Sequence, residues 1–152
     1  YLIKTYSHHH AFYKKEGKPL FYVYDSYKIP KEEWVKILSK DGEETVRNTD
    51  LDALYIGLWV EKDDAKFFDS SGFDGFYTYF ASEGFVYGST TAHWDFLSKY
   101  ANDHHLIFIP CVGPGYSDTR IRPWNEANFK SRNAPNKPKR QMAGSTVFLV
   151  EH

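Results

Sequence analysis

The chain has 152 residues, which fits one domain, since domains cluster at about 100–200 residues. Nineteen basic and twenty acidic residues give a formal net charge of −1, so charge provides no reason to expect a nucleic-acid partner or an anionic membrane. The single cysteine, Cys111, excludes an intrachain disulfide, and the longest apolar run, residues 53–60, is too short to span a bilayer. Aromatic residues make up 18% of the chain, a surplus that suits a large core or an aromatic-lined ligand site.

Apolar segments alternate with helical patterns along the chain up to Val112. The predicted strands are residues 19–25, 53–60, 72–80 and 106–112. The predicted helices are one opened by Pro30 with Trp34, Ile37 and Leu38 on its buried face, a short one near residues 63–69, and one capped by Thr90 or Thr91 that buries Trp94, Leu97 and Ala101. This alternation predicts an α/β fold of about four parallel βα units with right-handed crossovers.

Four such units are compatible with two architectures, an open doubly wound sheet or half of a (β/α)8 barrel. In both, the ligand site lies at the carboxyl ends of the strands. Polar and aromatic residues gather directly after the predicted strands: Asp25, Tyr27, Glu61, Tyr79 and the stretch 116–125. The sequence therefore predicts that these residues face one common site.

Neither the histidines nor the cysteine predict a catalytic or metal centre. His8–His10 and His104–His105 are runs of adjacent residues, whose side chains point in different directions in a turn, so surface loops are favoured over metal sites. Cys111 lies in an apolar segment, which favours a small buried residue over a nucleophile. A phosphate-binding loop is disfavoured because a proline separates Gly113 from Gly115 and interrupts the N–H donors that a phosphate needs.

The stretch 113–125 is the most informative part of the chain. It places Tyr, Asp, Asn, Trp and two Arg residues beyond a strand end. Aromatic faces pack on CH groups while the polar side chains hydrogen-bond hydroxyls, so the mixture suits a polyhydroxylated ligand; an ordinary structured loop is the alternative. From Lys130 onward, basic residues and prolines favour a solvated linker, and residues 146–150 form a candidate last strand.

Several segments together resemble the glycoprotein endo-α-1,2-mannosidases, glycoside hydrolase family 99. The matching stretches are Phe21-Tyr-Val-Tyr-Asp-Ser-Tyr27, Phe73-Asp-Gly-Phe-Tyr-Thr-Tyr-Phe80, Gly113-Pro-Gly-Tyr-Ser-Asp-Thr-Arg-Ile-Arg-Pro-Trp-Asn125, His10-Ala-Phe-Tyr13 and Arg47-Asn-Thr49. The resemblance covers about residues 6–132 and implies a partial (β/α)8 TIM barrel, with the four predicted strands as strands four to seven. It divides the chain into a partial glycosidase barrel, residues 1–133, and a divergent basic tail, residues 134–152.

The resemblance also implies a chemistry. Members of the family are retaining hydrolases, active in the Golgi in animals, that cleave an internal α-1,2-mannosyl linkage of glucosylated high-mannose N-glycans and need no essential cofactor. Their two catalytic carboxylates lie in an Asn-Glu-Trp-His-Glu stretch, which is absent from the 152 residues. The neighbouring pairs Glu32-Glu33 and Glu43-Glu44 lack the spacing that two carboxylates need across a sugar ring. We therefore expect no catalytic residue and no metal ligand in this chain.

Only substrate-binding roles carry over from the family. The resemblance places Tyr79 near the reacting sugar and Arg122 at another sugar-binding position. Further residues of the matching segments that are expected to bind the mannoside are Tyr24, Asp25, Tyr27, Glu61, Tyr116, Trp124 and Asn125.

Three hypotheses follow from these observations. The chain is a piece of an endo-α-mannosidase, an inactive mannoside-binding module, or a non-functional splice or frameshift product, the last motivated by the basic tail after Ala134. Half a barrel leaves strand edges and an apolar interior uncovered, and exposed edges pair with other chains. The sequence therefore predicts self-association through the uncovered barrel edges.

Overall fold

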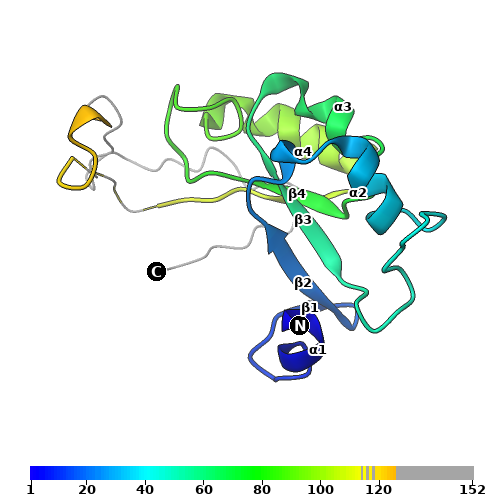
Figure 1. Cartoon of the computed structure of the whole chain (residues 1–152). Coiled ribbons are helices and arrows are strands. Elements are labelled where there is room, and N and C mark those ends of the chain that lie inside the picture. The colour runs from blue at the N-terminus through cyan, green and yellow to red at the C-terminus, as the bar shows by residue number, and fades with distance from the viewer. Residues whose placement is uncertain (114, 116, 118, 126–152) are drawn as a thin grey trace.

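The structure, a computed structural model, describes residues 1–113, 115, 117 and 119–125. It is built on a five-stranded sheet with the strand order β1-β2-β3-β4-β5 (Figure 1). The strands β1 to β5 span Lys14–Lys15, Lys18–Val23, Leu54–Trp59, Gly75–Thr78 and Ile107–Ile109. The four predicted strands coincide with β2 to β5, whereas β1 and the helix α1 (Leu2–Tyr6) are not predicted by the sequence pattern.

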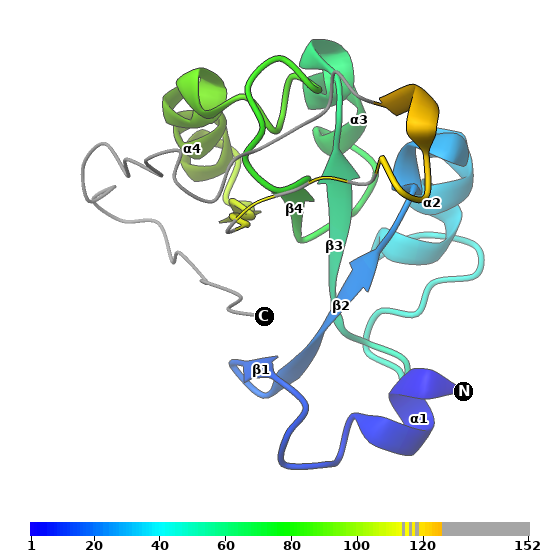
Figure 2. The same cartoon turned by 90° about the vertical axis from the view of Figure 1, so that its left-hand side faces the viewer.

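Strands β2 to β5 run parallel in one continuous register, in which Val23 pairs with Gly57, Gly57 with Phe76, and Phe76 with Phe108. The short β1 pairs antiparallel with the start of β2. Helices α2 (Lys31–Leu38), α3 (Ala65–Phe68) and α4 (Trp94–Asp103) all lie on one side of the sheet (Figures 1 and 2). A doubly wound sheet carries helices on both faces, so this arrangement is that of a partial (β/α)8 barrel.

The helix signals in the sequence are largely confirmed. Pro30 is the N-cap of α2, and Glu32 and Glu33 occupy its first turn, where negative charge is favourable. The short 3-10 helices η1 (Ser26–Lys28), η2 (Lys62–Asp64), η3 (Thr91–His93) and η4 (Pro123–Asn125) lie between the longer elements. Thr90 precedes η3 rather than α4, and its side chain makes no cap hydrogen bond. The predicted cap at this position is therefore wrong in detail, because a 3-10 turn separates Thr90 from the α-helix.

Aromatic rings fill the layer between the sheet and its helices. Trp59 is fully buried, stacks on Phe68 at a centroid distance of 5.4 Å, and contacts Phe76 at 4.6 Å and Tyr100 at 5.1 Å. These rings come from two strands and two helices, so they join the layers. Each buried large apolar side chain contributes about 1.5–3 kcal/mol to stability, which makes this cluster the main source of cohesion in the fold.

The opposite face of the sheet corresponds to the barrel interior. Leu20, Ile56 and Ile109 form a second buried cluster there. In contrast, Tyr22 and Tyr24 on the same face are 43% and 66% exposed. The expectation of an uncovered apolar interior is therefore refined: Leu20, Ile56 and Ile109 are buried, Leu54 and Ile107 are half-buried, and the exposed part of this face carries tyrosines.

The remaining residues singled out in the sequence are also placed. His8, His9 and His10 are exposed, and Cys111 is half-buried just beyond β5, where burial raises the pKa of its thiol. Across the described part of the chain, no helix is long and apolar enough to cross a bilayer. The predicted basic tail and its candidate strand at residues 146–150 lie outside the described residues.

Candidate sugar-binding site

Two tyrosines meet at the carboxyl ends of strands that are not neighbours in the sheet. Tyr24 directly follows β2 and Tyr79 directly follows β4, and their hydroxyl oxygens lie 3.0 Å apart. Their rings meet edge to face at 6.1 Å, and Tyr22 and Tyr77 form a similar pair at 5.1 Å one step further down the strands. Because side chains alternate along a strand, both pairs project from the helix-free face of the sheet.

The turn after β2 adds a third tyrosine to this group. The Tyr27 hydroxyl donates to Asp25 Oδ1 at 3.1 Å, and Lys28 Nζ lies 2.5 Å from Asp25 Oδ2. Tyr27 also lies close enough to Tyr79 for each phenol to affect the pKa of the other. We refer to Tyr24, Tyr27 and Tyr79 as the tyrosine cluster. The structure thus brings together four of the residues that the sequence predicts for sugar binding.

The environment keeps the phenols of Tyr27 and Tyr79 protonated. Burial, together with the hydrogen bond to Tyr24, raises the pKa of Tyr79 above its ordinary value of 10.0. Burial and the Asp25 carboxylate raise the pKa of Tyr27 as well. A neutral phenol both donates and accepts hydrogen bonds, as does a sugar hydroxyl. The cluster therefore has the chemistry to bind a polyhydroxylated ligand at neutral pH.

Glu61 follows β3 at the same end of the sheet, between Tyr24 and Tyr79 in strand order. It is the N-cap of η2, where its side chain accepts the backbone N–H of Asp64 in a capping box. Asp64 in turn accepts the N–H groups of Val60 and Glu61 at 2.7 and 2.8 Å. The Glu61 carboxylate is exposed but tied to this turn, so a ligand has to compete with the cap for it.

Phe85 belongs to the site, although it is not among the residues that the sequence predicts. Its ring is 43% exposed and meets the Tyr79 ring at a centroid distance of 5.8 Å. The loop that carries it is held by Ser89, whose Oγ donates to the Ser82 carbonyl and accepts the Val86 N–H. An aromatic residue in a Gly- and Ser-rich segment just after a strand is the signal that could have pointed to it.

The segment 119–125 is placed differently. It is drawn in orange in Figure 1 and stands away from the sheet on the helix-free side. Arg122 is exposed, and Trp124 is 81% exposed. The structure does not bring this segment against the tyrosine cluster. Asn125 belongs to η4, and Tyr116 lies outside the described residues, so sugar binding by Arg122, Trp124, Asn125 and Tyr116 stays a prediction.

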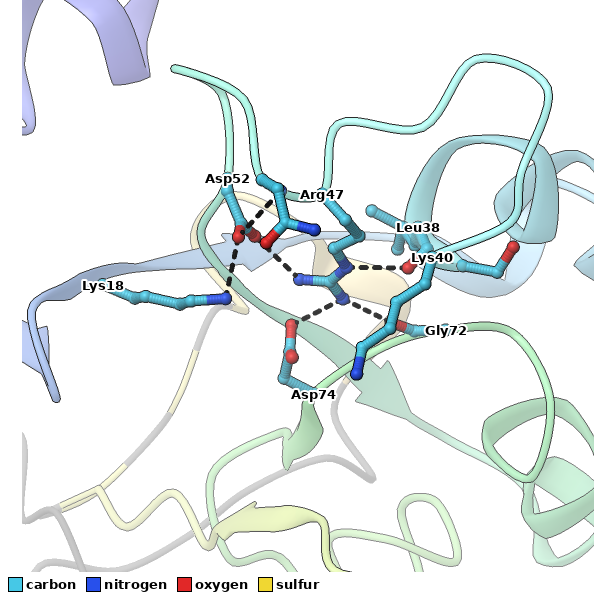
Figure 3. A pocket seen from close by; sticks show the side chains of 9 residues that line it. Lys18, Leu38, Lys40, Arg47, Asp52, Gly72 and Asp74 are labelled. Carbon is cyan, nitrogen blue, oxygen red and sulfur yellow. Dashed lines mark hydrogen bonds and ion pairs between the residues drawn. The ribbon is translucent and has the colours of Figure 1, made fainter.

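A polar pocket of about 300 Å³ lies at the opposite, amino end of the strands (Figure 3). Its lining residues are Lys18, Leu38, Ser39, Lys40, Arg47, Asn48, Asp52, Gly72 and Asp74. The Arg47 guanidinium dominates it and donates to three backbone carbonyls, those of Leu38, Ala53 and Gly72, at 2.6–2.8 Å. The same group also donates to Asp52 and Asp74. All of its donors are engaged within the protein, so the pocket is a structural junction rather than a ligand site.

The described residues contain no carboxylate pair poised across a sugar. Both oxygens of Asp25 are occupied, and Glu61 caps η2. Among the same residues, no group of three or more His, Cys, Asp or Glu side chains is close enough to hold a metal ion. The arrangement can therefore bind and orient hydroxyl groups, whereas acid–base chemistry requires residues from elsewhere.

Comparisons with known proteins identify the family of the chain. The model of glycosyl hydrolase family 99 matches residues 1–143. The glycoprotein endo-α-1,2-mannosidase of Xenopus laevis and the glycoprotein endo-α-1,2-mannosidase-like protein of Homo sapiens are each 46% identical to the chain over 137 residues. The solved family 99 endo-α-mannosidase of Bacteroides thetaiotaomicron, in complex with bis-tris-propane, superimposes with a TM-score of 0.82 at 48% identity and covers 87% of the chain.

The chain is shorter than these relatives. It spans 30% of the Xenopus and human proteins and 41% of the Bacteroides chain. The similarity nevertheless includes most of its own length, and the family model matches far more than half of it. The chain therefore belongs to glycosyl hydrolase family 99.

Proposed function

We propose that this chain forms the part of an endo-α-1,2-mannosidase that binds and orients the mannoside. The hydroxyl contact of 3.0 Å between Tyr24 and Tyr79 carries this proposal, because it gathers protonated phenols where a barrel binds its substrate. The names of the relatives support an α-1,2-linked mannoside on a glycoprotein as the ligand. A glucosylated high-mannose N-glycan processed in the Golgi is the substrate and location that we propose for the whole protein.

Whether this chain only binds the glycan or also hydrolyses it depends on the catalytic carboxylates. Retaining and inverting glycosidases both need two carboxyl groups at a set distance across the scissile bond. The Asn-Glu-Trp-His-Glu stretch of the family is not among the 152 residues. We therefore propose that these residues bind the glycan without hydrolysing it, and that hydrolysis by a longer product depends on that stretch.

Titration of the chain with α-1,2-mannobiose, followed by NMR or calorimetry, tests the proposal. We expect saturable binding that Tyr79→Phe weakens, because the variant keeps the ring and loses one hydroxyl. Arg122→Ala tests the predicted contribution of the segment 119–125. Tyr87→Phe is the matched control, since Tyr87 packs on His93 away from the cluster, at a centroid distance of 3.9 Å. Absence of binding by a folded chain would contradict the proposal and favour a non-functional product.

A further inference from the structure

The turn that follows β2 is fixed to its surroundings from both sides. Ser26 is completely buried, and its Oγ accepts the backbone N–H of Leu58 at 2.9 Å. The pairing of β2 with β3 ends one step earlier, at Val23 and Gly57, so this hydroxyl takes the place of the next ladder partner. The Ser26 carbonyl accepts the indole N–H of Trp34 at 2.9 Å. The turn is thus joined to β3 and to α2.

Gly57 makes room for this turn. A Cβ atom at position 57 would lie 2.8 Å from the Phe68 ring and 3.0 Å from Ser26 Oγ. Contacts this short force neighbouring groups to move, so a side chain here displaces the turn or the helix behind it. The sequence therefore keeps a glycine where the turn comes closest to the sheet.

Asp25 begins this turn in an unusual conformation. Its backbone is left-handed, with φ 54° and ψ 30°, a region where Asp and Asn are the commonest residues after glycine. In this conformation both carboxylate oxygens are engaged, Oδ1 by the Tyr27 hydroxyl and Oδ2 by Lys28. The charge of Asp25 is therefore already neutralised within the protein, and a ligand does not find a free carboxylate.

We propose that Asp25 is a positioning residue, which acts on the bound sugar through Tyr27 rather than by touching it. The proposal rests on the proposed mannoside-binding function. Tyr27 has one proton, and Asp25 accepts it. The Tyr27 oxygen is then left as an acceptor beside the Tyr24–Tyr79 hydroxyl pair. Asp25 thus fixes Tyr27 as an acceptor within the tyrosine cluster, and with it the group that Tyr27 presents to a sugar.

Substitutions at position 25 distinguish the effect of the carboxylate from the effect of the left-handed backbone conformation. Asp25→Gly keeps the left-handed turn and removes both oxygens. Asp25→Asn also tolerates the turn and keeps one oxygen that accepts the Tyr27 proton. Asp50→Gly is the matched control, because Asp50 also pairs with a lysine, Lys4, at 2.7 Å but on an exposed surface.

Each variant is labelled with ¹³C at the Cζ atoms of tyrosine, and the Tyr27 and Tyr79 resonances and the affinity for α-1,2-mannobiose are measured. We expect Asp25→Gly to shift the Tyr27 resonance and to weaken binding about tenfold, the loss of one charge-assisted hydrogen bond. Asp25→Asn is expected to restore the Tyr27 resonance and to bind within about twofold of the unsubstituted chain, because one acceptor remains. Asp50→Gly should change neither.

The outcomes that overturn the inference are distinct. An unchanged Tyr27 resonance in Asp25→Gly shows that the carboxylate does not position Tyr27. Weaker binding with unchanged resonances shows that Asp25 contacts the sugar directly, which also contradicts a positioning role. If the unsubstituted chain binds no mannoside, the proposed function fails, while the Tyr27 resonance still decides whether Asp25 positions Tyr27.

Discussion

Arg47 and Asp74 form a bridge between the loop before β3 and the loop before β4. Arg47 Nη2 donates to Asp74 Oδ2 at 2.9 Å, and the same oxygen accepts the backbone N–H of Tyr55, in β3, at 2.8 Å. The Arg47 side chain is only 9% exposed. This ion pair thus holds the first residues of β3 and β4 together, at the end of the sheet opposite the tyrosine cluster.

The first prediction concerns this bridge. Arg47→Met removes five hydrogen-bond donors and leaves Asp52 and Asp74 without their common partner, so we expect a loss of about 3 kcal/mol in the free energy of unfolding. Urea denaturation measures it. Lys36→Met is the control, because Lys36 pairs with Glu33 on the surface and its removal should cost less than about 1 kcal/mol. Equal losses in the two variants would contradict the role of Arg47.

The second prediction concerns alkaline pH. Burial raises the pKa of Tyr77, so the folded chain holds this proton at pH values where the unfolded chain loses it. The contribution of Tyr77 to stability is therefore complete below about pH 10 and is lost as the pH rises above that value. We expect Tyr77→Phe to lose less stability than the unsubstituted chain between about pH 9 and pH 11, in urea denaturation at each pH. Parallel pH profiles would show that Tyr77 does not carry this effect.

The sequence predicted the sheet better than the site. The apolar runs located β2 to β5, because the strands of a parallel sheet are continuously apolar, even in β2, where Tyr22 is 43% exposed. The two-residue β1 has no such pattern. The turn at Asp25 was also not predictable, since it depends on the Ser26 hydroxyl reaching Leu58, which is 32 positions away. A hydrophobic pattern reports which face is buried, whereas a turn held by distant hydrogen bonds is decided by tertiary structure.

The third prediction tests Phe85 as an aromatic wall beside Tyr79. We expect Phe85→Ala to weaken α-1,2-mannobiose binding by about threefold to tenfold, since an aromatic contact is worth about 0.5–1.5 kcal/mol. Phe85→Trp should retain binding. Phe96→Ala is a close match in exposure, 47% against 43%, but lies on α4, and it should leave the affinity unchanged. The same titration by NMR measures all three, and similar effects at positions 85 and 96 would rule out a specific contact.

The last prediction concerns the open edge of the sheet. Within the described residues no strand pairs with the outer side of β5, and its unpaired backbone groups are a template for another chain. We therefore expect the apparent mass in sedimentation equilibrium to rise with protein concentration.

Ile107→Lys places a charge on this strand, a device by which natural edge strands resist pairing, and should lower the association. Ile29→Lys adds the same charge at a side chain that is 44% exposed and lies outside the sheet. This variant should therefore not lower the association. A monodisperse monomer that melts cooperatively would show that the chain protects its edge, and equal effects of the two lysines would assign the association to net charge rather than to β5.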